Sequence, residues 1–201
     1  MFELFRQNHE ARIRKGFKQL GEKCSFSGLP PEIKGDVSMG SGCTVRGNVV
    51  LRTHDGGRIV VGDEVELADY AMLHSNGLIE IGSGTHIGTH TVVRDNNHLF
   101  QGTDAHWRIT PLIVQPIRIG AGCYIGPMSY IMPGVTIGDG AVVGPGSIVN
   151  RDIGANEMWA GSPARLVADR KDTENRSQLK RHLDLVSMFG VPGRDGDTSD
   201  R

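Results

Sequence analysis

The sequence has few aromatic side chains and no long apolar run. Phe, Trp and Tyr make up 5% of the 201 residues, so any interior must be built from aliphatic side chains. The 22 Lys and Arg residues nearly balance the 23 Asp and Glu residues, which excludes a protein that binds polyanions by bulk charge. No apolar run exceeds five residues, so the sequence predicts no membrane-spanning helix.

Cysteine is scarce as well. Cys24, Cys43 and Cys123 are odd in number and widely spaced, which favours a reducing compartment over a disulfide framework. The first residues, Met1-Phe-Glu-Leu-Phe-Arg, lack the basic segment and apolar stretch of a signal peptide. These features predict a cytoplasmic protein.

An aliphatic residue recurs every six positions through most of the chain. In one unbroken register the stride visits six residues: Ile119, Ile125, Ile131, Ile137, Val143 and Val149. Three further registers, which begin at Ile33, Val61 and Ile81, bring the total to seventeen hexads. Glycine directly follows the aliphatic residue in eight of them, and a small or β-branched residue stands four positions after it in most.

Such a period predicts a coil of short strands. Residues two apart share a face of a strand, so the small residue and the next aliphatic residue both point inward. The glycine after the aliphatic residue is expected where the chain turns with a positive φ. Three hexads close one triangular coil, and seventeen hexads predict an all-β parallel β-helix of about six coils whose strands stack at about 4.8 Å.

The remaining segments are assigned around this coil. We expect an N-terminal helical cap over residues 1–30 and a β-helix domain over 31–167, interrupted by a long loop at 100–117. Apolar residues at helical spacing predict a C-terminal helix over 168–190, and 191–201 is expected to be a flexible tail. A structureless loop as long as 100–117 in a compact fold usually carries function.

The end of the repeat resembles a known family. The run Ile131-Met-Pro-Gly-Val-Thr-Ile-Gly-Asp-Gly-Ala-Val-Val-Gly-Pro-Gly-Ser-Ile-Val149, followed by Ala160-Gly-Ser-Pro-Ala-Arg165, is similar to the C-terminal signature of bacterial sugar and polysaccharide O-acetyltransferases of the hexapeptide-repeat type. The resemblance covers residues 33–166. It implies a left-handed β-helix, a homotrimer, acetyl-CoA as co-substrate and no metal.

His98 is the leading catalytic candidate. It ends the hexad that begins at Val93, so it is expected to project from the coil wall between inward-facing Asn97 and Leu99, just before the long loop. In the resembled family the catalytic histidine stands at this place, and Asp95-Asn-Asn-His98 fits the Asp-x-x-His form of the polysaccharide-modifying branch. A neutral imidazole is the natural general base for a hydroxyl acceptor, with Asp95 or a backbone carbonyl to fix its tautomer. The alternative is an ordinary exposed histidine at a corner.

Three further residues are candidates for contact with the acceptor. Asn97 is expected in an inward slot, where its amide braces the strand of His98 or forms part of an asparagine ladder. Trp107 in the long loop could stack on a sugar ring or pack against a neighbouring subunit, and His106 lies beside it. The acidic residue common before the loop's final proline in the small-oligosaccharide branch is absent from Leu112-Ile-Val-Gln-Pro116, which favours the polysaccharide branch.

The resemblance also implies the residues that bind acetyl-CoA. By position, Pro127 and Pro145 would line the pantetheine arm, and Asn150, Arg151 and Arg165 would lie near the adenosine and phosphate end. Arginine suits phosphate because its guanidinium fork gives directed, charge-assisted hydrogen bonds. The alternative for Arg151 and Arg165 is ordinary surface charge.

Several functions remain to be compared. The first is an acetyl-CoA-dependent O-acetyltransferase that acts on a sugar hydroxyl of a polysaccharide, glycolipid or sugar precursor. The second changes the acceptor, to the amine of a nucleotide-linked sugar or the hydroxyl of an antibiotic. A β-helix carbonic anhydrase is disfavoured because it needs two ligand histidines five residues apart, and none of the intervals between successive histidines from His54 to His106 is five. The last is a trimeric scaffold without activity.

Overall fold

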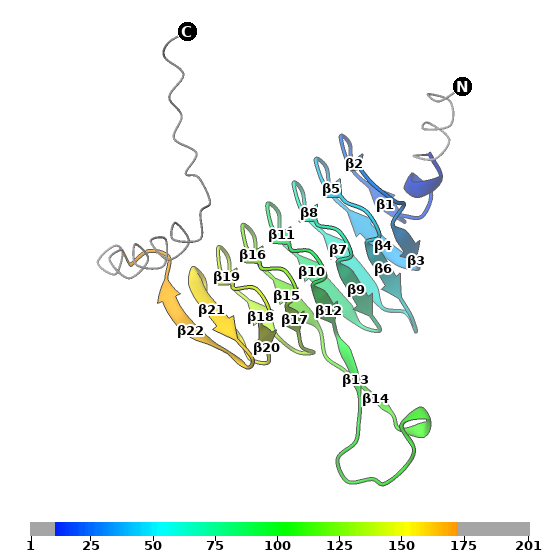
Figure 1. The fold of residues 1–201 in the computed structure, drawn as a ribbon. Helices are drawn as coiled ribbons and strands as arrows, with labels where there is room; N and C mark the ends of the chain where they lie inside the picture. Colours follow the sequence, from blue (N-terminus) through cyan, green and yellow to red (C-terminus); the bar gives the residue numbers. More distant parts are fainter. Residues whose placement is uncertain (1–10, 173–201) are drawn as a thin grey trace.

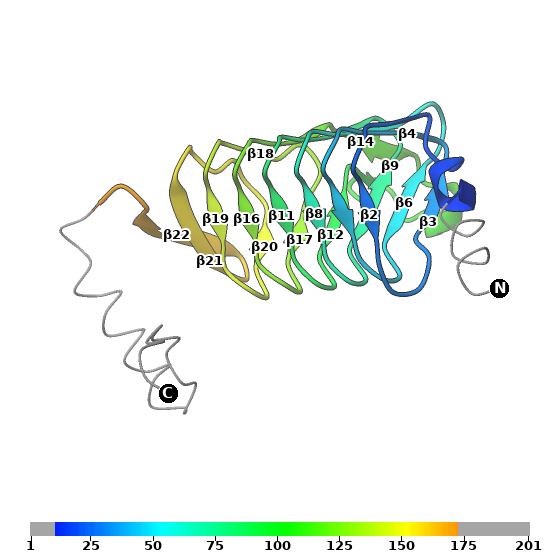
Figure 2. The ribbon, with the colours of Figure 1, turned by 90° about the horizontal axis from the view of Figure 1, so that it is seen from above.

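The computed structural model describes residues 11–172, and these form a β-solenoid with very little helix. Short parallel strands stack coil upon coil, so that the N-terminal and C-terminal turns lie at opposite ends of the stack (Figure 1). Seen from above, the strands of one face run in a row along the axis (Figure 2). The predicted all-β, parallel β-helix is therefore confirmed.

The solenoid has three faces, each a sheet of parallel strands. The first face contains β1 (Gln19–Leu20), β4 (Asp36–Met39), β7 (Arg58–Val61), β10 (Leu78–Ile81), β15 (Ile117–Ile119) and β18 (Thr136–Ile137). The second face contains β2 (Ser25–Phe26), β5 (Thr44–Val45), β8 (Glu66–Leu67), β11 (His86–Ile87), β16 (Tyr124–Ile125), β19 (Val142–Val143) and β21 (Glu157–Gly161), edged by antiparallel β22 (Ala164–Asp169). The third face contains β3 (Glu32–Lys34), β6 (Val50–Thr53), β9 (Met72–Ser75), β12 (Val92–Arg94), β17 (Tyr130–Ile131) and β20 (Ile148–Val149).

The described chain makes about seven turns rather than six, because the coil begins earlier and ends later than expected. Leu20 and Phe26 are six residues apart and stack on Met39 and Val45, so 19–34 form a first coil. At the other end Ile153 bridges to Ile137, and Trp159 pairs with Val143. A helical cap over 1–30 is therefore wrong for its described part, where only 11–14 are helical.

The C-terminal boundaries also change. The chain turns back at 162–163 to form the β21–β22 hairpin, so 168–169 belong to a strand and 170–172 are not helical, against the helix expected from 168. Residues 173–190 of the expected helix and the tail at 191–201 lie outside the described residues. None of the helices among residues 11–172 is long and apolar enough to cross a membrane.

The aliphatic residues of the hexads that form the coils point inward, as predicted, and Leu99 on the arm is the exception. Within the described coils Leu51, Leu73, Ile87 and Ile125 are completely buried. Parallel register places each of them directly on the equivalent residue of the next coil, for example Leu51 on Leu73. The core is thus a set of aliphatic columns along the axis, which a chain with few aromatic residues can build.

The glycine after the aliphatic residue has a different role from the one predicted. Gly82 does not have a positive φ; a Cβ there would lie 2.5 Å from the backbone of Gly120 and Ala121 in the next coil. The expectation of positive φ at this position is therefore wrong, and close approach between coils is the reason for glycine. Positive φ occurs two residues later, at Gly84, Tyr70, His90 and their equivalents.

Candidate active site

The long interruption of the repeat is a β-hairpin arm and not a structureless loop. After Asp95 the chain leaves the third face as β13 (Asn96–His98) and returns as antiparallel β14 (Leu112–Val114), with the 3₁₀ helix η1 (Trp107–Ile109) between them. The arm projects from the side of the solenoid (Figure 1). Backbone hydrogen bonds from Gln115 to Asp95 and from Leu99 to Pro111 hold its two sides together.

His98 lies on this arm, and its imidazole is oriented by Thr110. The Nδ1 atom of His98 is 3.1 Å from Thr110 Oγ1, which itself donates to the carbonyl oxygen of Trp107 at 2.8 Å. A hydroxyl has one proton to donate, so toward His98 it can only accept. Nδ1 therefore carries the ring hydrogen, and Nε2 keeps a free lone pair. Thr110 is 7% exposed, so this pair of hydrogen bonds is largely shielded from water.

Aromatic side chains surround this imidazole. The ring of Trp107 meets that of His98 edge-on with centroids 5.6 Å apart, and the Phe100 ring lies at 6.1 Å. Trp107 and Phe100 are 52% and 58% exposed, so both present apolar surface beside the base. His106 contacts Trp107 rather than His98, and its Nδ1 accepts from the backbone N–H of Arg108.

Asp95 does not orient His98. Its carboxylate is completely buried and accepts from the Ser75 hydroxyl at 2.7 Å and from the backbone N–H groups of Asn76 and Gly77, each at 2.9 Å. The Nδ2 of Asn96 is a further donor at 3.2 Å. The catalytic assignment of Asp95 is therefore wrong in geometry: the residue fastens the base of the arm to the turn after β9.

The register of the arm also differs from the predicted hexad. Asn96 and not Asn97 is buried, because the chain departs from the coil at Asp95 and the six-residue stride ends there. Asn97 is exposed, and its Oδ1 accepts from the backbone N–H of His98 at 2.9 Å. Leu99 likewise lies on the arm rather than in the core.

The five residues expected to bind acetyl-CoA occupy three separate places in this chain. Pro127 and Pro145 stack one coil apart at the corner between the second and third faces, where the Pro127 carbonyl accepts from Gly146 N–H. Asn150 and Arg151 are exposed at the opposite edge of the third face, directly after β20. Arg165 is exposed on β22, and its guanidinium donates to the adjacent Ala164 carbonyl. One chain therefore does not bring them together.

Sequence reasoning missed Thr110 and Phe100. The sequence gives no signal for Thr110, since its proximity to His98 depends on the hairpin register that pairs His98 with Leu112. Phe100 was visible only as one residue of the long loop. Among residues 11–172, no group of three or more His, Cys, Asp or Glu side chains is arranged to hold a metal ion.

The three thiols are buried and play no part in this site. Burial raises the pKa of Cys43 to about 11, and it also raises the pKa of Cys123. A thiol of raised pKa is protonated near neutrality and a poor nucleophile. The arm therefore supports direct attack by an acceptor rather than transfer through a cysteine.

Comparison with known proteins gives one family-model match and similar solved structures. The family model described as bacterial transferase hexapeptide (six repeats) matches residues 116–151, and a comparison with curated protein sequences gives no match. Among solved structures, the acetyltransferase VCA0836 of Vibrio cholerae O1 biovar eltor, complexed with acetyl-CoA, is 28% identical. The match covers 83% of this chain and 79% of the VCA0836 chain, with a TM-score of 0.57.

A second structure is similar over more of the chain. AntD, an N-acyltransferase from Bacillus cereus in complex with dTDP and 3-hydroxybutyryl-CoA, has a TM-score of 0.70 at 22% identity. The match covers 90% of this chain and 96% of AntD. The chain thus carries a transferase hexapeptide repeat over residues 116–151 and shares its β-helix fold with two acyltransferases whose structures contain acyl-CoA.

Proposed function

We propose that the protein transfers an acetyl group from acetyl-CoA to a hydroxyl of a sugar, with His98 as the general base. The observation that carries this proposal is the chain of hydrogen bonds from His98 Nδ1 through Thr110 to the Trp107 carbonyl. It leaves Nε2 unprotonated, which is the state that a base requires. A hydroxyl acceptor has a high pKa and depends on such a base more than an amine does.

The step balances without a covalent enzyme intermediate. His98 Nε2 takes the hydroxyl proton as the oxygen attacks the thioester carbonyl carbon. The carbon–sulfur bond then breaks, and the imidazolium returns its proton to the CoA thiolate. The products are the acetyl ester and free CoA. Thr110 stabilises the imidazolium by accepting from Nδ1 throughout.

Aromatic side chains beside the base support a sugar as the acceptor. Trp107 and Phe100 are half exposed, and their ring centroids lie 5.6 Å and 6.1 Å from that of His98. Apolar ring faces suit the C–H faces of a pyranose, while the hydroxyls remain free for His98 and the exposed Asn97 amide. His106 extends this surface behind Trp107.

The proposed co-substrate site lies between subunits. Pro127 and Pro145 form one wall, and Asn150, Arg151 and Arg165 lie elsewhere on the same chain. A second copy in a homotrimer would bring the two sets together, as the family resemblance implies. The acyl-CoA complexes of VCA0836 and AntD support acyl-CoA as the donor.

The amine of a nucleotide-linked amino sugar is the second candidate acceptor. The dTDP complex of AntD favours it, since that N-acyltransferase shares the fold over 90% of this chain. Such an acceptor attacks as a neutral amine, and His98 would then remove a proton after attack. An acceptor panel separates the two: the first candidate predicts ester formation on sugars, the second amide formation on amino sugars only.

The test is release of CoA thiol by wild type and by His98→Ala, with sugars, nucleotide sugars, amino sugars and an antibiotic hydroxyl as acceptors. We expect acceptor-dependent release that falls about 10²–10⁴-fold in His98→Ala while acetyl-CoA binding persists. An active His98→Ala enzyme would refute the assignment of the base. A wild type that neither binds acetyl-CoA nor releases thiol with any acceptor would favour a scaffold.

A further inference from the structure

The outer side of the third face carries an unusual column of positive charge. Lys34 pairs in register with Arg52, Arg52 with His74, and His74 with Arg94, so these four side chains stack on consecutive strands. Inward Leu73 and Val93 precede His74 and Arg94, and therefore the latter two point outward. Neighbouring strands are about 4.8 Å apart, and like charges directly opposite each other destabilise a sheet.

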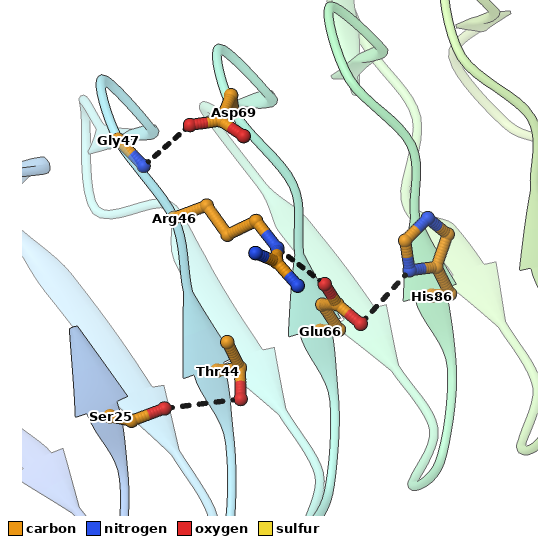
Figure 3. A network of polar contacts seen from close by, with 7 residues as sticks. All are labelled: Ser25, Thr44, Arg46, Gly47, Glu66, Asp69 and His86. Carbon is orange, nitrogen blue, oxygen red and sulfur yellow. Dashed lines mark hydrogen bonds and ion pairs between the residues drawn. The ribbon is translucent and has the colours of Figure 1, made fainter. Parts of the chain in front are cut away.

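Two arginines on the other two faces pair with carboxylates. On the second face the Nε of Arg46 donates to Glu66 at 2.6 Å, and the other Glu66 oxygen lies 3.5 Å from His86 (Figure 3). On the first face Arg118 pairs with Glu80 at 2.8 Å. The same figure shows two further contacts on this face: the Ser25 hydroxyl lies against the Thr44 hydroxyl, and the Gly47 N–H donates to the Asp69 carboxylate.

The column on the third face lacks this compensation. Glu32 is its one carboxylate partner among the described residues, and it pairs with Arg52. Arg94 instead donates to the neutral Oδ1 of Asn96 at 3.0 Å. The nearby carboxylates have other partners. The buried Asp95 carboxylate accepts from the backbone N–H of Asn76, and the Asp55 carboxylate accepts from the side-chain amide of Asn76.

His74 lies between the two arginines in an environment that keeps its ring neutral. Burial lowers its pKa, and Arg52, Arg94 and His54 lower the pKa further, while Glu32 opposes them. Its Nε2 is buried and has no hydrogen-bond partner among residues 11–172. An unpaired buried polar atom in a field of unbalanced positive charge requires an explanation.

We propose that Arg52, His74 and Arg94 form a binding site for a phosphate or diphosphate group of the acceptor. Guanidinium groups bind phosphate through paired, charge-assisted hydrogen bonds. An anion between the two arginines would neutralise the column at the position of His74. The inference rests on the proposed function, because it identifies the acceptor as a phosphorylated or nucleotide-linked sugar.

The distance to His98 fits one substrate molecule. His98 is four positions after Arg94, so their Cα atoms lie at most about 14 Å apart even in a fully extended chain. The arm that carries His98 begins immediately after β12, which carries Arg94. Arg94 also holds Asn96 at the base of this arm. A sugar with its reacting group at His98 can therefore place its phosphate on the column.

Binding of inorganic pyrophosphate, measured by calorimetry on the full chain already saturated with CoA, tests this site. We expect pyrophosphate to bind to wild type and to bind at least tenfold more weakly to Arg94→Gln and to His74→Asn. The His74 side chain has no hydrogen bond to Asn96, whose side chain bonds to Arg94, Asn76 and Asp95, so His74→Asn separates anion binding from disturbance of Asn96. Arg118→Gln is the matched control, an outward arginine on another face, and it should bind pyrophosphate as wild type does.

Three results would overturn the proposal. One is the absence of binding to wild type, and another is an equal loss in Arg118→Gln, which would indicate non-specific attraction. The third is binding to the free protein that CoA abolishes, since the column would then hold phosphates of the donor. Failure of acyl transfer with intact pyrophosphate binding would refute the proposed function and leave the anion site standing.

Discussion

At the residue scale, the orientation of the His98 ring depends on the threonine behind it. Thr110 accepts from Nδ1 only because its own proton is donated to the Trp107 carbonyl. In many enzymes a carboxylate fixes the tautomer of a catalytic histidine, and the sequence suggested Asp95 for that role. Here a neutral hydroxyl performs it, so the imidazolium has no adjacent negative charge to stabilise it.

Replacing Thr110 with Val should lower kcat about tenfold or more, equivalent to about 1.4 kcal/mol of transition-state stabilisation. Without the Thr110 hydroxyl to accept from Nδ1, the ring hydrogen of His98 can reside on either Nδ1 or Nε2, and the ring loses its fixed orientation. Steady-state kinetics should show an unchanged KM for acetyl-CoA, since Thr110 is placed at the base and not at the donor. Thr110→Ser, which retains the hydroxyl, should recover most of kcat; equal losses in both variants would indicate a purely structural role.

The pKa of His74 predicts an effect of pH on stability. Burial first, and then Arg52 and Arg94, lower this pKa in the folded protein from the ordinary 6.5. As the pH falls below 6.5, the unfolded chain takes up a proton before the folded one does, so the free energy of unfolding decreases. This destabilisation by His74 is absent above pH 6.5 and is complete once the pH lies below the lowered pKa of His74 in the folded protein.

Urea denaturation of wild type and His74→Asn between pH 7.5 and about 5 measures this contribution. The wild-type free energy of unfolding should fall more steeply than that of the variant, by at most about 1.4 kcal/mol per pH unit for one proton. The comparison isolates His74, because the other histidines are common to both proteins. Parallel pH curves for the two proteins would show that His74 titrates normally.

At the scale of the strand and turn, two glycines of one corner have opposite reasons for being glycine. Gly82 has ordinary φ, but a Cβ would lie 2.5 Å from backbone atoms of the next coil. Gly84 has a φ of +68° and open space around its missing side chain. Gly82→Ala should therefore destabilise the protein by roughly 1–3 kcal/mol or more through overpacking.

Gly84→Ala is the matched control at the same corner. The left-handed conformation costs an L-residue roughly 1–2 kcal/mol, and part of this is offset because alanine restricts the unfolded chain. Thermal unfolding should place its midpoint between those of wild type and Gly82→Ala. Tyr70 and His90 occupy the equivalent position with positive φ, which shows that this site tolerates a side chain. A Gly84→Ala variant less stable than Gly82→Ala would contradict the assignment.

The predictability of these elements follows from the range of the interactions that fix them. The six-residue stride is local, so the coils and their buried columns could be read directly. The first coil was missed because one extra residue between Phe26 and Ile33 breaks the register, although Leu20, Gly21 and Cys24 repeat the pattern. The reason for glycine at Gly82 depends on a neighbouring coil nearly forty residues away and could not be read locally.

At the scale of the whole molecule, the hairpin arm carries His98 away from the solenoid. His98 could be selected as a candidate from its place before the long loop, whereas Thr110 could not, because only the antiparallel pairing of β13 with β14 brings the two together. The arm also exposes apolar side chains away from the core. Ile109, the last residue of η1, is 77% exposed, and Phe100 and Trp107 are more than half exposed.

These exposed apolar side chains predict that the arm packs against another subunit, and we expect activity to depend on that association. We expect the protein to form a homotrimer in which the arm packs against a second copy, and Ile109→Asp to dissociate it. A charge introduced into an apolar interface is desolvated without a partner and opposes assembly. Sedimentation velocity across a range of concentrations should show trimers for wild type and for the control Ile109→Val, and monomers for Ile109→Asp. Thiol release should fall together with the trimer, because one chain does not gather Pro127, Pro145, Arg151 and Arg165 at one place. A monomeric Ile109→Asp enzyme with wild-type activity would show that one chain suffices for activity. The exposed apolar side chains of the arm would then serve the acceptor alone.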